Sequence, residues 1–201
     1  MTLVPHLQRL AYKQAPGVRF ELRPQATQPQ RALERGEADL LIIPKDFCST
    51  SHPSELLFEE TFCSVLWSES HLASGTLTED RYMSAGHVVV QPGDGVALTD
   101  WFMQQSSIKR QAETSTFSFL SQASLVVGTH RIATMHRRLA LLAARFLPIA
   151  IRDLPVPIPH MQQVVQWHQH RTTDPGLVWL RALLREAATA MDSPQPPGTP
   201  G

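Results

Sequence analysis

A near-continuous apolar run from Ala38 to Pro44 constrains the fold more than any other feature of this sequence. The run follows a short helical stretch, Pro29 to Arg35, that Gly36 closes as a C-terminal cap. Unbroken apolarity over so few residues is typical of a strand that is buried on both faces, as in a parallel sheet. A helix leading into such a strand therefore predicts an α/β fold.

Similar blocks alternate along most of the chain. Leu3, Leu7 and Leu10 share one face of a helix that stops before Pro16-Gly17, and the last helix has Thr173 or Asp174 as its cap. The other predicted helices cover residues 78–84, 98–106, 118–127, 137–146 and 175–191. The predicted strands cover residues 18–22, 87–91, 110–116, 131–135, 149–154 and 163–167, with two adjoining strands within 56–67.

This order of elements predicts two lobes, the first of them discontinuous. Residues 1–67 and 160–191 would form lobe one, residues 68–159 lobe two, and residues 192–201 a disordered tail. Open α/β sheets bind ligands beyond the carboxyl ends of their strands, so we expect the function to lie in a cleft between the lobes.

Charge and cysteine content exclude several classes of protein. The 18 basic and 18 acidic residues balance, which leaves no positive field to hold a phosphate backbone. The two cysteines, Cys48 and Cys63, and the absence of a secretory signal indicate a cytoplasmic, reduced protein. No apolar run approaches the roughly 20 residues that span a bilayer, so we expect no membrane segment.

Motifs for catalysis or for a cofactor are not found. There is no Gly-x-Ser-x-Gly, no phosphate loop and no His-Glu-x-x-His, and Gly93-Asp94-Gly95 is too short for a dinucleotide fingerprint. Cys48 with His52, and His168 with His170, lack the further ligands of a metal site. We therefore predict no enzymatic activity, no cofactor and no metal.

Several segments, taken in order, resemble the effector-binding domain of LysR-type transcriptional regulators. The similarity runs from about Thr2 to Met191 and is nearest to the branch of nodulation and aromatic-degradation regulators. It is carried by "APGVRFELRP", "ALERGEADLLIIP", "HPSELLFEETFCSVLW", "MSAGHVVVQPG", "GTHRIATMHRRLA" and "DPGLVWLR".

The resemblance implies a two-lobed fold like that of type II periplasmic binding proteins. It also implies a small inducer in the interlobe cleft, in this branch an aromatic or phenolic acid or a flavonoid, and a homodimer or tetramer. Promoter DNA would be bound only through a winged helix-turn-helix domain.

The sequence departs from the family pattern at its start. It has no helix-turn-helix region, and the first strand of lobe one is missing before the helix that contains Leu3. Our hypothesis is that Met1 marks a fragment or a late start.

In lobe two, the candidate effector contacts lie where strands pass into helices. Ser118 and Phe119 match a position where the family places a polar or aromatic contact, although Ser118 could simply cap its helix. Thr134, Met135 and His136 repeat this arrangement, and His136 could donate to an anionic or phenolic oxygen or be an ordinary surface residue.

In lobe one, the candidates follow two strands. After Pro44, Lys45 could neutralise an acid and Phe47 could stack on a ring, although both could be solvated loop residues. Trp167 and His168 end the return strand and could line the opposite wall, although a strand tryptophan is more often core.

Three other functions remain open. A solute-binding protein of a transport system would share the fold but should carry an export signal. An enzyme would need an activated nucleophile or an acid-base pair. The chain could also be a non-functional fragment of a regulator.

Overall fold

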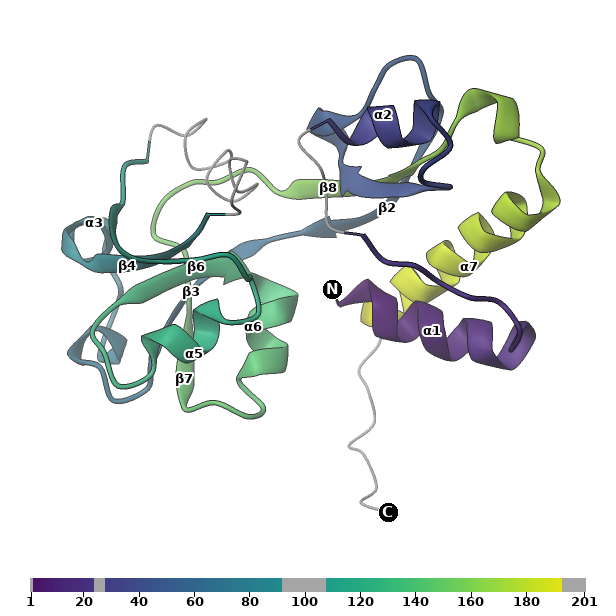
Figure 1. Cartoon of the computed structure of the whole chain (residues 1–201). Coiled ribbons are helices and arrows are strands. Elements are labelled where there is room, and N and C mark those ends of the chain that lie inside the picture. The colour runs from purple at the N-terminus through teal and green to yellow at the C-terminus, as the bar shows by residue number, and fades with distance from the viewer. Residues whose placement is uncertain (1, 24–27, 92–107, 193–201) are drawn as a thin grey trace. The chain divides into compact units, whose positions relative to one another are not determined.

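The computed structural model describes residues 2–23, 28–91 and 108–192, and the chain forms two compact units (Figure 1). Unit 1 combines the residues up to Glu59 with those from Met161 onward, and unit 2 is the segment from Glu60 to His160. The helix predicted at 98–106 and the Gly93-Asp94-Gly95 segment lie outside the described residues, as does all of the predicted tail except Asp192.

Unit 1 contains a three-stranded sheet in the order β1-β8-β2. Its strands are β1 (Leu41–Pro44), β8 (Met161–Gln166) and β2 (Ser54–Glu60). Strand β1 pairs with β8 in the antiparallel sense, so the parallel arrangement expected from the apolar run is wrong for this pair. An apolar run indicates that a strand is buried but not whether its neighbours run parallel to it. Here Ile42 is 40% exposed, so the expected burial of both faces of the strand is also wrong.

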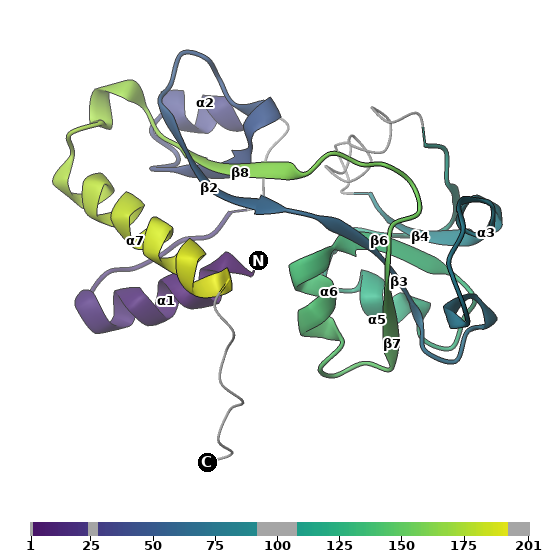
Figure 2. The same cartoon turned by 180° about the vertical axis from the view of Figure 1, so that it is seen from behind.

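Two long helices build the core of unit 1. Helix α1 (Leu3–Gln14) lies beside α7 (Pro175–Asp192) in both views (Figures 1 and 2). Both helices bury residues spaced three or four apart, the period of one helical face. The core cluster consists of Leu3, Leu7, Ala11, Val165, Trp167, Leu183, Leu184, Ala187 and Ala188. The shorter helix α2 (Pro29–Glu34) precedes β1.

The ends of these helices show what sequence patterns do and do not determine. The Leu177 N–H donates to Asp174 Oδ1 at 3.0 Å, which confirms Asp174 as the cap of α7. Residues 18–22 do not form the strand that was predicted for them. The Val18 N–H donates to the Ala15 carbonyl in a turn, and Leu22 is exposed. Alternation of side chains makes a strand only where a neighbouring strand supplies hydrogen bonds.

Unit 2 is built on a five-stranded sheet in the order β5-β4-β6-β3-β7. Strands β4 (Gly86–Val90), β5 (Gln111–Thr116) and β6 (Ile132–His136) are mutually parallel, while β3 (Phe62–Trp67) is antiparallel to β6 and to β7 (Ile149–Asp153). These bounds agree to within about one residue with the strands expected here.

The helices of unit 2 pack on this sheet. Helices α5 (Gln122–Val126) and α6 (Arg137–Ala143) bury Val126, Leu139 and their neighbours against β3, β4 and β6. A second cluster holds Leu66, Leu72, Ala73, Leu77, Tyr82, Ala85, Ile132 and Val156, and includes α3 (Glu79–Ser84). Strand β6 contributes to both clusters and is therefore a central, doubly covered strand.

Strand direction gives the unit 2 sheet two chemically distinct edges. The carboxyl ends of β4, β5 and β6 share one edge, and the register that sets Phe62 opposite His136 brings the start of β3 to that edge as well. We call this the carboxyl edge, and the opposite one, where these three parallel strands begin, the amino edge.

Within the described part of the chain, no helix combines the length and apolarity needed to cross a bilayer.

The α1–α7 core of unit 1 should depend on single buried leucines. We expect Leu184→Ala to lower the free energy of unfolding by about 2–5 kcal/mol, because it leaves a cavity between the two helices. The matched control, Val178→Ala on the exposed side of α7, should cost less than about 0.5 kcal/mol. Urea unfolding followed by circular dichroism measures both, and equal costs would contradict the described packing.

Candidate functional site

Three aromatic rings meet at the carboxyl edge of unit 2. His136 ends β6, Phe62 begins β3, and Phe119 lies in the turn that follows β5. The His136 ring centroid lies 5.2 Å from that of Phe62 and 5.7 Å from that of Phe119, both edge-on. We call these three residues the aromatic trio. The sequence predicts His136 and Phe119 as site residues but not Phe62, because the place of Phe62 depends on the β3–β6 register.

His136 is uncharged at neutral pH. Burial lowers the pKa of its imidazole to about 4, so the ring carries one N–H donor and one acceptor nitrogen. A neutral imidazole suits a phenolic hydroxyl or a carbonyl oxygen better than it would serve as the counter-ion of a carboxylate. His136 therefore has one N–H that can donate to a ligand, but it supplies no charge.

Ser118 stabilises the turn before α5. Its hydroxyl oxygen accepts the Leu120 N–H at 3.3 Å, and its carbonyl accepts the Ser121 hydroxyl at 2.9 Å. Helix α5 starts at Gln122, four residues later than predicted, so Ser118 is not the helix cap. Serine side chains compete with helices by closing such turns, and the Ser118 O–H remains a donor for a ligand oxygen.

Thr134 and Met135 do not reach the surface. Both are fully buried: the Thr134 hydroxyl pairs with the Tyr82 hydroxyl at 2.7 Å, and Met135 packs in the core under α6. Both faces of β6 are covered, so the side chains that point to either face of the sheet are buried. In this conformation neither residue can touch an effector, which corrects the expectation for these two positions.

A buried ion pair lies near the trio. Glu60, with 3% of its side chain exposed, pairs with Arg138 at 3.2 Å. Burial raises the pKa of the Glu60 carboxyl, and the Arg138 guanidinium opposes that rise. The adjacent Arg137 pairs with Asp153, whose side chain is 91% exposed. Of these two arginines at the start of α6, Arg138 thus pairs with a buried carboxylate and Arg137 with an exposed one.

The candidates after β1 occupy different environments. Pro44 is buried, Lys45 is exposed, and Phe47 is half-buried in a short 3-10 helix, Lys45–Phe47. The carbonyl of Phe47 accepts a hydrogen bond from the Gln30 amide. None of these contacts points to a ligand.

The candidates after β8 lie at the other end of the unit 1 sheet. Pro44 pairs with Gln163 near the start of β8, while Trp167 follows its end, about 13 Å away at the usual rise of a strand. Trp167 is core: it is 3% exposed, its ring stacks on the Arg181 guanidinium, and its N–H donates to Thr172. His168 Nδ1 accepts the His170 N–H. Pro44 and Trp167 therefore lie at opposite ends of this sheet.

The described residues do not indicate a metal site or a reactive thiol. In the residues that the structure describes, no group of three or more His, Cys, Asp and Glu side chains could hold a metal ion. Both cysteines are free, and burial raises the pKa of the Cys63 thiol to about 12, which keeps it protonated and unreactive.

Comparison with known proteins gives a consistent picture. A family model described as the LysR substrate binding domain matches residues 1–189. Nodulation protein D of Bradyrhizobium sp. (strain ANU 289) is 38% identical over 183 residues, which cover 90% of this chain and 54% of that protein. Nodulation protein D 1 of Rhizobium tropici is 37% identical over 184 residues, covering 90% of this chain and 60% of the relative. The chain thus spans a little over half the length of these relatives.

Solved structures agree on the fold. The regulatory domain of MexT, a transcriptional activator in Pseudomonas aeruginosa, superposes with a TM-score of 0.78 at 21% identity, covering 92% of this chain and 91% of that domain. The reduced OxyR regulatory domain from the same species gives 0.74 at 17% identity, covering 97% and 92%. At these identities the likeness is one of fold.

The two neighbouring arginines of the carboxyl edge should differ sharply in their contribution to stability. We expect Arg138→Ala to cost about 3 kcal/mol, because it leaves the Glu60 carboxylate buried without its counter-ion. Arg137→Ala breaks a pair with an exposed partner and should cost less than about 1 kcal/mol.

The loss of folding stability caused by Arg138→Ala should also become smaller as the pH is lowered. Without Arg138, the folded-state pKa of Glu60 lies further above its unfolded value, so the folded state takes up the proton first and regains stability as pH falls from 7 toward 5. Urea unfolding at both pH values measures this. A cost that does not change with pH would show that Glu60 is not the group that loses its counter-ion.

Proposed function

This chain belongs to the LysR substrate binding domain family, and from that premise we propose that it binds a small aromatic or phenolic acid as the effector-binding domain of a LysR-type transcriptional regulator. The full-length protein would bind promoter DNA through a helix-turn-helix domain, act as a homodimer or tetramer, and work in the cytoplasm.

The aromatic trio is the observation that supports an aromatic effector. Phe119, which is half-buried, offers its ring to a planar ligand, while the buried Phe62 packs behind His136. An aromatic contact of this kind adds about 0.5–1.5 kcal/mol beyond the area it buries. The neutral His136 can donate to a hydroxyl or carbonyl oxygen. The Ser118 hydroxyl, one residue before Phe119, can donate to a carboxylate or phenolate oxygen.

Pro44, Lys45, Phe47 and His168 remain candidates from sequence alone, and the proposal does not depend on them. Thr134, Met135 and Trp167 are left out, because their burial and their hydrogen bonds already account for them.

Regulation requires more than binding. An effector shifts a conformational equilibrium only by the difference between its affinities for the two states. The zero net charge of the chain argues against direct contact with DNA, so the change would have to be passed to an attached DNA-binding domain.

Two other functions are less well supported. A solute-binding protein would share this fold, but the relatives reported above are nodulation proteins and the solved neighbours include a transcriptional activator. An enzyme would need an activated nucleophile. The one thiol at the carboxyl edge, Cys63, is buried and protonated, and His136 contacts phenylalanine rings rather than a carboxylate.

Effector binding can be tested on this chain with 4-hydroxybenzoate as the probe. At a hundredfold excess over its Kd, a ligand stabilises the folded state by about 2.7 kcal/mol, which for a chain of this size raises the Tm by about 5–10 °C. Cyclohexanecarboxylate, which has the carboxylate but no aromatic ring, is the matched control and should raise the Tm by less than about 1 °C. Naringenin extends the test to flavonoids.

Substitutions then place the site. We expect Phe119→Ala and Ser118→Ala each to weaken binding of the active probe at least about tenfold in calorimetric titration, a loss of about 1.4 kcal/mol. Phe146→Ala, which removes a 78% exposed ring elsewhere in unit 2, should leave the Kd unchanged. If both site variants bind as tightly as wild type, the carboxyl-edge assignment is wrong.

A further inference from the structure

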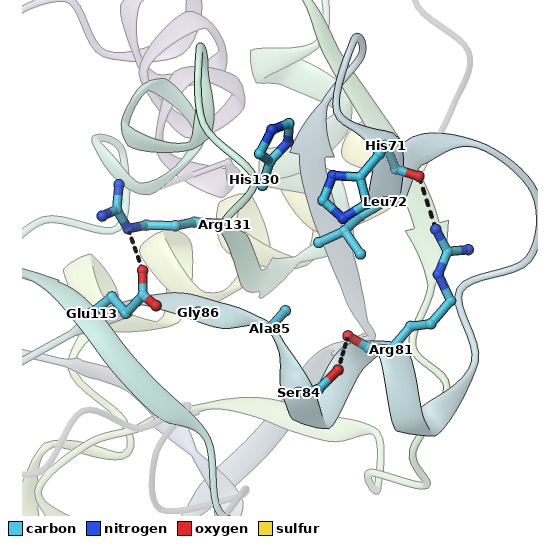
Figure 3. Close-up of a pocket in the computed structure, with 9 residues that line it drawn as sticks. All are labelled: His71, Leu72, Arg81, Ser84, Ala85, Gly86, Glu113, His130 and Arg131. Carbon is cyan, nitrogen blue, oxygen red and sulfur yellow. Dashed lines mark hydrogen bonds and ion pairs between the residues drawn. The ribbon is translucent and has the colours of Figure 1, made fainter.

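A cavity lies at the amino edge of unit 2, away from the aromatic trio. It has a volume of about 350 Å³, within the usual range for small-molecule sites, and Figure 3 shows its lining residues. Gly86 begins β4, Glu113 lies in β5, and His130 and Arg131 precede β6. The other wall comes from a short 3-10 helix, His71–Ala73, and from α3. We call this cavity the amino-edge pocket.

An irregularity in the sheet aims Glu113 into the pocket. Between β4 and β5 the register passes from His87 opposite Ala112 to Val88 opposite Thr114, which leaves Glu113 as the extra residue. Such bulges redirect a side chain. The Glu113 carboxyl group then lies over Gly86, where any Cβ would overlap it. Glycine at this position therefore leaves room for the Glu113 side chain, which any other residue would push aside.

Glu113 in turn orients a cation. Its Oε2 accepts the Nε–H of Arg131 at 3.0 Å, and both side chains remain more than a third exposed (Figure 3). A guanidinium has five N–H donors in a fixed fork, and this bond uses one of them. The terminal N–H groups of Arg131 can therefore donate to the oxygens of a ligand in the bidentate manner typical of arginine.

Two imidazoles stand on the opposite wall. The rings of His71 and His130 lie edge-to-face with centroids 4.4 Å apart (Figure 3). His130 Nδ1 lies 3.2 Å from the hydroxyl oxygen of buried Ser70, which also accepts the Leu72 N–H. The Ser70 hydroxyl also has an O–H that can donate to Nδ1. When Ser70 donates in this way, the proton of His130 is on Nε2 and is a further donor.

Arg81 fixes the remaining wall. Its guanidinium donates to the carbonyls of His71, Ser74 and Thr76 at 2.8, 3.1 and 2.7 Å, which holds the loop carrying His71 in place. Its charge adds to that of Arg131 against the single carboxylate of Glu113. The lining thus holds two guanidinium groups against one carboxylate, an excess of positive charge.

We propose that the amino-edge pocket binds a small oxyanion, a carboxylate or a phosphate, as a ligand site separate from the aromatic effector site. Arg131 supplies the bidentate contact, His130 and His71 supply further donors, and Glu113 keeps Arg131 in position. The proposal does not rest on the aromatic effector, because the two sites lie at opposite edges of the sheet and share no residue.

The test uses this chain with inorganic phosphate and with succinate as separate probes, each titrated calorimetrically against a chloride background of equal ionic strength. We expect saturable one-to-one binding of at least one probe, and the probe that binds better identifies the class of anion. Absence of saturable binding by both probes would overturn the proposal.

Three variants locate the site and test whether a negative charge in it weakens binding. Arg131→Gln should weaken binding at least about tenfold, whereas Arg23→Gln, at an exposed arginine whose Nε also pairs with a carboxylate, should not change it. Glu113→Gln keeps an acceptor for Arg131 but removes the repelling charge, so it should strengthen anion binding. A purely structural role of Glu113 would give the opposite result. Weaker binding in Glu113→Gln, or no effect of Arg131→Gln, would overturn the assignment.

Nuclear magnetic resonance gives a readout that does not need the variants. The ring signals of His71 and His130 should shift as the anion saturates the pocket, while those of His136 at the carboxyl edge should stay unchanged. Shifts confined to histidines outside the pocket would also overturn the proposal.

Discussion

The antiparallel register of β3 on β6 is the constraint on which the candidate effector site depends. Strand β6 is parallel to β4 and antiparallel to β3, so the end of one strand and the start of the other meet, with Phe62 opposite His136. A slip of one residue would turn every side chain of β3 to the other face. Phe62 would then leave His136, and the buried Val65 and Leu66 would exchange faces.

The same directionality separates two kinds of chemistry within one sheet. The carboxyl edge presents aromatic rings and a neutral imidazole, with the nearby charges of Glu60 and Arg138 already paired. The amino edge presents an arginine held by a carboxylate next to two histidines. A planar aromatic ligand gains most from contact and desolvation, whereas an oxyanion gains most from oriented donors. One unit can therefore hold two sites of different selectivity.

Local patterns predicted most of unit 2. The strand-helix alternation, the position of β7 and the family resemblance all follow from signals within a few residues, and the LysR fold is confirmed by the family match and the solved neighbours. The cap of α7 by Asp174 is another local feature that the sequence predicts correctly.

Features that depend on distant residues were not predictable in this way. The direction of β1 is set by its partner β8, which lies more than a hundred residues later. Thr134 and Met135 follow a strand-end pattern, but the helices and strands that cover β6 bury them. Phe62 and Glu60 gave no local signal as site residues, because their partners His136 and Arg138 lie far along the chain.

The central claim is that an aromatic effector contacts the carboxyl edge of unit 2. Intermolecular nuclear Overhauser effects between 4-hydroxybenzoate and a chain labelled in its phenylalanine and histidine rings test it most directly. We predict cross-peaks from the ligand ring protons to Phe119, Phe62 and His136. Saturating ligand that gives cross-peaks only to other rings, such as Phe47, would contradict it.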